Sequence, residues 1–359
     1  MNTINAKFPK KSFNESIMEY NDEKIILLGH GSGGELTHQL IQNIFRKFLT
    51  DTSLDESHDS VSINLNLGSE YTAIMSTDSF VVKPLFFSGG DIGKLSVIGT
   101  INDIAMSGAE PIYLSVAFII EEGFKITDLE KIVKSIADEA TKNNVRVVCG
   151  DTKVVERGHG DGLYINTTGI GRVLQSKKIL PKNIEPGDFI YVSGDVGRHG
   201  MAIMSEREHL DFKSQIISDC QSLWPLIYEL QQNKIELHCL RDLSRGGLMT
   251  SLVELAETSE CNMQIIEDQI PISEPVRSAC EILGLDPLYV ANEGTCTVIV
   301  PESQVLQIKK NQAFLNLKLI GRVLDKVKEK EKAKVFLKTL YGVERRMFRL
   351  MGDQLPRIC

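Results

Sequence analysis

The 359-residue chain has little tryptophan, no paired cysteines and no excess of positive charge. It contains one tryptophan, and its seven cysteines are scattered without a Cys-x-x-Cys pair. That spacing argues against a zinc knuckle, and an odd number of separate cysteines argues against a disulfide framework. The formal net charge of −8 argues against non-specific binding to nucleic acid, which requires clustered positive charge.

Long hydrophobic segments are also missing. The longest apolar run, Tyr113–Ile120, has the length of a strand and falls well short of the ~20 residues that span a bilayer. The first 20 residues are polar and contain Lys7, Lys10 and Lys11, without the apolar core of a signal peptide. We therefore expect a cytoplasmic protein that binds neither membrane nor nucleic acid.

The first half of the chain predicts a mixture of helices and strands. Residues 1–28 are polar and predict an extended arm. A helix follows, because apolar residues between Leu36 and Phe48 recur with helical spacing. Helices are also expected over 92–105 and 127–143, the second opened by a capping box of Thr127 and Glu130. Strands are predicted at Val61–Leu67, Tyr71–Ser76, Tyr113–Ile120, Val145–Cys149 and Leu163–Ile170.

The second half repeats this mixture. Pro181, Pro186 and Gly187 interrupt the pattern, and such residues commonly separate structural units. Since the length favours two domains, the predicted fold is α+β, with two consecutive mixed α/β domains. We expect an arm at 1–28, domains at 29–180 and 181–350, and a mobile tail at 351–359.

Three aspartates are candidate metal ligands. Asp78 and Asp151 each follow a predicted strand, and Asp103 lies in a largely apolar predicted helix beside Asn102. A carboxylate on a buried helix is costly unless it is paired or binds a cation, and Mg²⁺ with phosphates uses carboxylates from separate elements. For Asp78 and Asp151, capping of a turn is an equally simple interpretation.

Three segments are candidate anion sites because each precedes a predicted helix. The run Gly29–Gly34, which contains His30, is rich in glycine, so its backbone N–H groups can approach a phosphate. It is not a P-loop, and a flexible hinge is the alternative. Gly194–Gly200 is a second such turn. Arg241 and Arg245 flank the third, where an Arg–Asp ion pair that orders the loop is the alternative.

Two further side chains and the chain end are candidates for chemistry. Lys153 could contact phosphate as a point charge, or be a solvated surface residue. Glu293, in Asn292-Glu293-Gly294, could be a base or only a turn residue. Cys359 joins a thiol to the terminal carboxylate. Its position at the very end excludes a prenylation signal. The Cys359 thiol therefore either has no function or is a group that becomes modified.

Taken in order, these segments resemble the HypE family of hydrogenase maturation proteins, in the superfamily of aminoimidazole ribonucleotide synthetase and selenophosphate synthetase. The resemblance runs from about Leu27 to Cys359. The stretches that carry it are GHGSGG (29–34), TDSF (77–80), PLFFSGGDIGKL (84–95), GTINDIAMSGAEPIYLS (99–115), GDTKVVERG (150–158), INTTGIG (165–171), RDLSRGG (241–247), LDPLYVANEG (285–294) and LPRIC (355–359).

The resemblance implies a specific activity. In this family a partner carbamoyltransferase, HypF, places a carbamoyl group on the terminal cysteine, here Cys359. ATP then activates the carbamoyl oxygen, and loss of phosphate leaves a thiocyanate. The cyano group passes to the iron of a [NiFe]-hydrogenase precursor on a HypC–HypD complex. The resemblance also implies a homodimer that associates through the N-terminal domain, with ATP and Mg²⁺ in a groove.

The resemblance also implies roles for the candidate residues. Asp78, Asp103 and Asp151 match the carboxylates that bind Mg²⁺ with ATP. The expected cofactor-binding residues are His30, Ser32, Gly33, Asn102, Arg241 and Arg245. Cys359, Glu293 and Lys153 are the expected catalytic residues, with Glu293 or an aspartate as the base that removes an amide proton.

The chain departs from the family pattern at two positions. Arg198 stands where an acidic residue usually precedes His-Gly, and Thr295 stands where Lys or Arg often follows Asn-Glu-Gly. Two other functions remain possible at this point. One is another ATP-using synthetase of the superfamily, against which the LPRIC ending argues. The other is a non-catalytic scaffold that binds partners through its tail.

Overall fold

The N-terminal domain is a four-stranded sheet covered by helices on one face. The computed structural model describes residues 24–32, 34–51, 65, 68–174, 178–208, 215–328 and 331–350. The strand order is β1-β6-β4-β5. The strands are β1 (Tyr71–Phe80), β4 (Glu110–Glu121), β5 (Arg146–Val155) and β6 (Leu163–Leu174). β4 and β5 are parallel, and the other neighbours are antiparallel.

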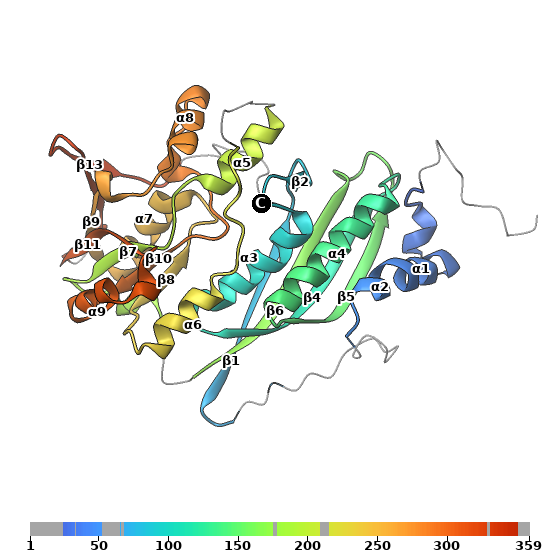
Figure 1. Cartoon of the computed structure of the whole chain (residues 1–359), viewed down its shortest axis with the longest axis horizontal. Coiled ribbons are helices and arrows are strands. Elements are labelled where there is room, and N and C mark those ends of the chain that lie inside the picture. The colour runs from blue at the N-terminus through green and yellow to red at the C-terminus, as the bar shows by residue number, and fades with distance from the viewer. Residues whose placement is uncertain are drawn as a thin grey trace, which may run out of the picture.

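Helices α3 (Ile92–Met106) and α4 (Ile126–Lys142) lie across the same face of this sheet (Figure 1). Nearly every α3 side chain is buried, because the helix packs on β1 and β6 on one side and meets the second domain on the other. α4 is amphipathic and buries one stripe of apolar residues, as expected for a surface helix. The opposite face of the sheet is uncovered: Met75 is 69% exposed and Ile119 is 45% exposed.

The segment before β1 packs beside β5. It comprises η1 (Leu28–Gly31), α1 (Glu35–Leu40), the π-helical turn η2 (Ile41–Phe45) and α2 (Arg46–Phe48). These elements lie beyond the β5 edge of the sheet (Figure 1). The end of the predicted arm belongs to the folded domain, since Ile26 is fully buried and Ile25 forms a bridge with Lys125.

The C-terminal domain is a seven-stranded sheet with helices. Its strand order is β13-β12-β9-β11-β7-β10-β8. The strands are β7 (Phe189–Val192), β8 (Cys239–Asp242), β9 (Cys261–Ile266), β10 (Cys296–Val300), β11 (Lys318–Lys326), β12 (Val335–Lys338) and β13 (Glu344–Met347). The helices are α5 (Arg198–Arg207), α6 (Trp224–Gln232), α7 (Gly247–Ser259), α8 (Glu274–Leu283) and α9 (Val305–Lys310).

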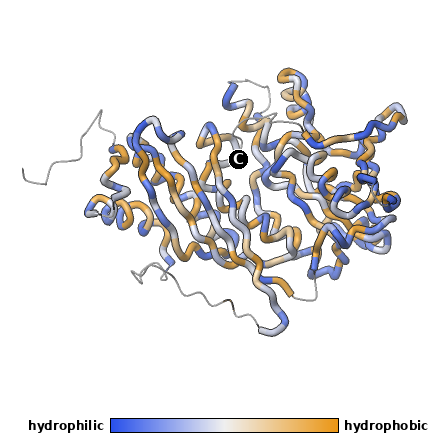
Figure 2. The backbone as a smooth tube through the Cα atoms, turned by 180° about the vertical axis from the view of Figure 1, so that it is seen from behind, coloured by the Kyte–Doolittle hydropathy of each residue, from blue (hydrophilic) through white to orange (hydrophobic). Residues whose placement is uncertain are grey.

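The two domains share hydrophobic packing through α3. Ala105 and Met106 at the end of α3 join a buried cluster with Leu223 and Ile227 of the second domain. Figure 2 shows hydrophobic residues recurring along the strands of both sheets.

The fold class predicted from the sequence, two consecutive mixed α/β domains, is confirmed. None of the helices that the described residues form has the length and apolar character needed to cross a membrane.

Several local predictions were wrong. Asp78 and Asp151 do not follow strands; they lie inside β1 and β5, which are longer than predicted. The capping box at Thr127 is absent, because α4 begins at Ile126 after Lys125 and has no side-chain cap. Most of the strand predicted at Val61–Leu67 lies outside the described residues.

Candidate functional site

A polar groove lies where β1, α3 and the β8–α7 connection meet. It has a volume of about 320 Å³ and is lined by Ser76, Thr77, Asp103, Arg241, Asp242, Ser244, Arg245 and Ser251. Three of the predicted site residues therefore come together here from segments far apart in the sequence. Carboxylates, guanidinium groups and hydroxyls in one groove are the groups that bind a metal–phosphate ligand.

Asp103 is the central carboxylate of this groove. Its Oδ2 accepts a 2.7 Å hydrogen bond from Ser76 Oγ on β1. Burial, reinforced by the negative charge of Asp242 and more weakly by that of Asp78, raises the pKa of Asp103 to about 6. Like charges in a partly desolvated site favour protonation or the binding of a cation.

Asp242 is a site residue that sequence reasoning missed. It ends β8, and Ser244 Oγ donates a hydrogen bond to its Oδ2. Arg241 beside it contacts Glu254, with 2.5 Å between Nη2 and Oε2. The signal was available in the sequence, because Asp242 is a carboxylate at the end of a strand inside the RDLSRGG segment.

Asp78 and Arg245 form the rim of the groove. Arg245 Nη2 lies 3.1 Å from Asp78 Oδ1, and the Arg245 side chain is 76% exposed. This ion pair joins β1 of the first domain to the β8–α7 connection of the second. An exposed pair of this kind is worth about 0–1 kcal/mol, so a phosphate could replace the carboxylate as the partner of Arg245 at little cost.

Asp103 and Asp242 fit a Mg²⁺ ion. Among the described residues, no three His, Cys, Asp or Glu side chains are placed to hold a metal together. Mg²⁺ bound with a nucleotide commonly uses only one or two protein carboxylates, because phosphates and water supply the other ligands. The raised pKa of Asp103, caused partly by Asp242 and Asp78, indicates negative charge that a cation would neutralise.

Asp151 does not join these carboxylates within one chain, contrary to the prediction. Four residues lie at the same level across the four strands: Asp78 on β1, Thr167 on β6, Val116 on β4 and Gly150 on β5. Asp151 is the next residue along β5, so it points to the opposite, uncovered face. Three strand spacings of ~4.8 Å also separate β1 from β5, roughly 14 Å in all. Lys153 shares this exposed face, two residues further along β5.

The predicted phosphate segment packs beside β5. Gly31 in η1 packs against β5, and a Cβ added to it would lie 2.6 Å from Val154 N. Ser32 Oγ donates to Gly29 O at 2.9 Å, and His30 Nδ1 contacts the backbone of Leu27. Burial lowers the pKa of His30. Gly33 lies outside the described residues.

Glu293 lies behind the groove as a buried carboxyl group. It is 4% exposed, and a Cβ on Gly99 of α3 would lie 3.8 Å from its Oε2. Burial raises its pKa well above the ordinary value, and the negative charges of Asp242 and Asp219 add to the effect. A carboxyl group in this environment holds its proton more tightly than a solvated one.

Asn102 has a structural role rather than the predicted cofactor contact. Its side chain is buried, and Nδ2 donates to the carbonyls of Gln221 at 3.1 Å and Glu293 at 3.0 Å. Its Oδ1 accepts from Leu223 N at 2.8 Å. The amide therefore joins α3 to two loops of the second domain and has both donor hydrogens in use.

The cysteines that the structure describes are poor candidates for modification. Five of them are buried, and Cys149 is partly buried. Burial raises the pKa of all six, to about 12 for Cys239, Cys280 and Cys296, and a protonated thiol is a weak nucleophile. Cys359 lies outside the described residues.

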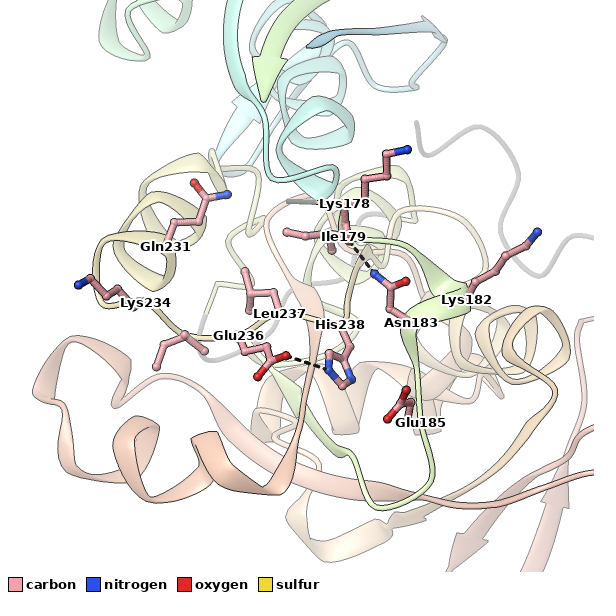
Figure 3. A pocket seen from close by; sticks show the side chains of 11 residues that line it. Lys178, Ile179, Lys182, Asn183, Glu185, Gln231, Lys234, Glu236, Leu237 and His238 are labelled. Carbon is pink, nitrogen blue, oxygen red and sulfur yellow. Dashed lines mark hydrogen bonds and ion pairs between the residues drawn. The ribbon is translucent and has the colours of Figure 1, made fainter. Parts of the chain in front are cut away.

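A larger cavity of about 760 Å³ lies near the junction of the domains, between Lys178–Glu185 and Gln231–His238. Figure 3 shows the side chains of Lys178, Lys182 and Lys234 directed away from its centre. His238 contacts the buried Asp188 at 2.7 Å. The cavity contains none of the predicted site residues, so its greater size does not make it the better candidate site.

The comparisons with known proteins agree with this fold. Models of the AIR synthase related protein match over residues 58–173 for its N-terminal domain and 185–334 for its C-terminal domain. The chain is 46% identical over 330 residues to the carbamoyl dehydratase HypE of Azotobacter vinelandii, covering 92% of this chain and 96% of the relative. The chain belongs to the HypE family.

Solved HypE structures share the whole architecture. A crystal structure of HypE in complex with ATP has a TM-score of 0.86 and 40% identity, and covers 93% of this chain and 99% of that one. A crystal structure of a HypE–HypF complex has a TM-score of 0.72 and 41% identity, and covers 87% of this chain and 99% of that one.

The two departures from the HypE pattern each contact an aspartate. Arg198 begins α5, and its Nη1 lies 3.3 Å from Asp195 Oδ1. Thr295 is 2% exposed and donates from Oγ1 to Asp219 Oδ2 at 2.8 Å. The two side chains therefore contact different aspartates. Thr295 donates a neutral hydroxyl to Asp219 at a buried position where Lys or Arg would place a positive charge.

Proposed function

We propose that the chain is an ATP-dependent carbamoyl dehydratase that carries its substrate on Cys359. The observation that carries the proposal is the groove in which Asp103 and Asp242 lie with Arg241 and Arg245, with the buried Glu293 behind it. The names of its relatives support the same chemistry, since they include carbamoyl dehydratases and a HypE bound to ATP.

The reaction removes water from a carbamoyl group. HypF first places the carbamoyl group on the sulfur of Cys359, and the γ-phosphoryl group of ATP then passes to the carbamoyl oxygen. The carbon–oxygen bond breaks with its electron pair leaving on phosphate. The nitrogen loses two protons as the carbon–nitrogen triple bond forms. The products are a thiocyanate on Cys359, ADP and phosphate.

The side chains of the groove have separate roles in this proposal. Asp103 and Asp242 hold Mg²⁺, which supplies charge neutralisation for the phosphates when it is bound. This pair replaces the predicted set of Asp78, Asp103 and Asp151. Arg241 and Arg245 contact phosphate oxygens, as guanidinium groups do in bidentate pairs, and Asp78 orients Arg245 through their 3.1 Å contact.

Glu293 is proposed as the base that removes a carbamoyl proton. A raised pKa suits this role, because a base works best when its pKa is near the operating pH. A Mg²⁺ ion on the nearby aspartates would offset the negative charges that help to keep Glu293 protonated. Binding of the metal and nucleotide would thereby favour the ionised form that accepts a proton.

A homodimer would complete the site. The uncovered face of the N-terminal sheet exposes Met75 and Ile119, and sheets commonly pack face to face. A two-fold axis along the strands would place β1 of one copy opposite β5 of the other. Lys153, His30 and Ser32 of one copy would then approach the groove of the second, where they keep their predicted roles in trans. Asp151 of the first copy would add a further carboxylate there.

The proposed partners follow from the same chemistry. The chain is proposed to accept its carbamoyl group from HypF in the cytoplasm and to donate cyanide to iron on a HypC–HypD complex. A HypE–HypF complex among the similar structures supports the first contact.

Intact mass spectrometry tests the proposed function. The full chain is incubated with HypF, carbamoyl phosphate and ATP, then with fresh ATP and Mg²⁺. The expected result is a carbamoyl adduct on Cys359 that loses the mass of one water. Nucleotide turnover that continues unchanged after removal of Cys359 would instead indicate another ATP-using synthetase. A chain that is modified but never dehydrated would refute the proposal.

A further inference from the structure

A buried aspartate outside the groove holds the turn that carries Glu293. Asp219 lies in the loop between α5 and α6 and is 2% exposed. Its carboxylate accepts four hydrogen bonds, all from residues 292–295. The donors are Asn292 Nδ2 at 2.9 Å, Glu293 N at 3.2 Å, Gly294 N at 3.1 Å and Thr295 Oγ1 at 2.8 Å.

These four donors are neutral groups from a single turn. Burying a carboxylate costs several kcal/mol, and this cost is offset only when donors are arranged around both oxygens. The turn therefore has its lowest free energy in the one conformation that directs four donors at Asp219. A change in that conformation would leave a buried charge without its partners.

The same turn is held from its other side by Asn102. Asn102 Nδ2 donates to Glu293 O at 3.0 Å, so the N–H and C=O of Glu293 are bound to different residues. Gly294 fits closely against the Asp219 loop, since a Cβ there would lie 1.8 Å from Asp219 O. The main chain of Glu293 has little freedom to shift, and its carboxyl group is directed towards α3.

We propose that Asp219 is a positioning residue for Glu293. The inference rests on the proposed role of Glu293 as the base. Asp219 acts through the backbone N–H of Glu293 and through the two residues that follow it. A base must lie within hydrogen-bond distance of the proton that it removes, and a displacement of ~1 Å can lower the rate by about 10²-fold. Loss of the Asp219 charge should therefore slow dehydration without preventing ATP from binding.

The test compares two buried aspartates. In Asp219→Asn one oxygen becomes an amide donor that faces other donors, which releases part of the turn. Asp188→Asn is the matched control, because Asp188 is also 2% exposed and accepts from Glu185 N and His238 Nδ1 beside β7. Both variants are carbamoylated with HypF, and dehydration is followed by intact mass after addition of ATP and Mg²⁺.

We expect the single-turnover rate constant of folded Asp219→Asn to fall on the order of 10²-fold. The ATP concentration for half-maximal rate should change little, and Asp188→Asn should keep the wild-type rate constant. A folded Asp219→Asn with the wild-type rate constant overturns the inference. A loss of rate that disappears at high ATP concentration also overturns the inference, because the defect would then lie in nucleotide binding.

A double mutant separates positioning from general destabilisation. If Asp219 acts through Glu293, adding Asp219→Asn to Glu293→Gln should slow the reaction no further than Glu293→Gln alone. Additive losses overturn the inference. If Glu293→Gln alone keeps the wild-type rate, Glu293 is not the base and Asp219 does not act through it. If the wild-type chain makes no thiocyanate, the proposed function itself is wrong, which is a distinct result.

Thr295 supplies a second test if Asp219→Asn fails to fold. Thr295→Val removes a single donor to Asp219 while keeping the shape of the side chain, and we expect about a tenfold loss of rate from the loss of one hydrogen bond. Thr295→Ser restores the hydroxyl and should recover most of that loss. Equal rates in the two folded variants would overturn the inference.

Discussion

Ser76 and Asp103 join the first strand of the N-terminal sheet to the helix that crosses it. Ser76 Oγ donates to Asp103 Oδ2 at 2.7 Å, although 27 residues separate the two in the sequence. The hydroxyl orients a carboxylate that burial and neighbouring charges make costly to ionise. Asp103 thus faces the groove shared by both domains, where Asp242 completes a pair of carboxylates.

Replacing Asp103 should remove metal-dependent activity. We expect Asp103→Asn to lower the rate of thiocyanate formation by at least about 10²-fold, the usual loss when charge stabilisation of a transition state is removed. The measurement is intact mass after addition of ATP and Mg²⁺, with a thermal shift on adding Mg²⁺–ATP as a second readout. Glu110→Gln, an exposed carboxylate at the start of β4, is the control. A normal rate in Asp103→Asn would refute the metal assignment.

Glu293 should make stability depend on pH. Its pKa is higher in the folded protein than in the unfolded chain, so the folded state binds the extra proton. The free energy of unfolding therefore falls as pH rises above ~4.3, the ordinary pKa of glutamate. Glu293→Gln lacks this contribution and should melt higher than wild type at pH 8, by at least about 2 °C.

The difference in melting temperature should shrink as the pH is lowered to 5, because Glu293 in the unfolded chain then begins to bind the proton that the folded state already holds. Differential scanning calorimetry in metal-free buffer gives both values. A melting difference that is the same at pH 5 and pH 8 would show that Glu293 is not a buried, perturbed carboxyl group.

Cys359 should be the only cysteine that product formation requires. Cys359→Ala is expected to abolish the carbamoyl adduct and all thiocyanate while leaving the melting temperature unchanged. Cys149→Ala is the matched control, since Cys149 is the least buried of the described cysteines. An adduct that persists in Cys359→Ala would place the modification elsewhere.

Charges on the uncovered sheet face should weaken the proposed dimer. Met75 is 69% exposed on β1, and Met75→Asp would bury two like charges in a two-fold interface, which costs several kcal/mol. We expect monomers in analytical ultracentrifugation at concentrations where the wild type is dimeric. Tyr341→Asp, which alters a 93% exposed residue between β12 and β13, should leave the dimer intact. If the wild type is monomeric, the completion of the site by a second copy is wrong.

The sequence alone predicted most of the elements and the family. Apolar periodicity located the helix around 92–105, because that pattern depends only on neighbours in the chain. The helix at 127–143 was predicted from a capping box, and the helix is present although the capping box is not. The ordered motifs from Gly29 to Cys359 predicted the chemistry. The strand boundaries around Asp78 and Asp151 were wrong, since polar residues on an uncovered or functional face interrupt the apolar alternation that marks a strand.

Only the tertiary structure decided which residues share a site. The register of the sheet places Asp151 on the opposite face from Asp78. Which face each side chain takes depends on how the strands pair, and no local sequence pattern shows that pairing. Asp219 accepts hydrogen bonds from residues more than 70 positions away, and Asp242 shares a groove with the distant Asp103. Their roles therefore depend on how β8, α3 and the 292–295 turn pack together. The sequence by itself determined the residue types of the candidate site, and the long-range packing of the two domains determined which of them meet.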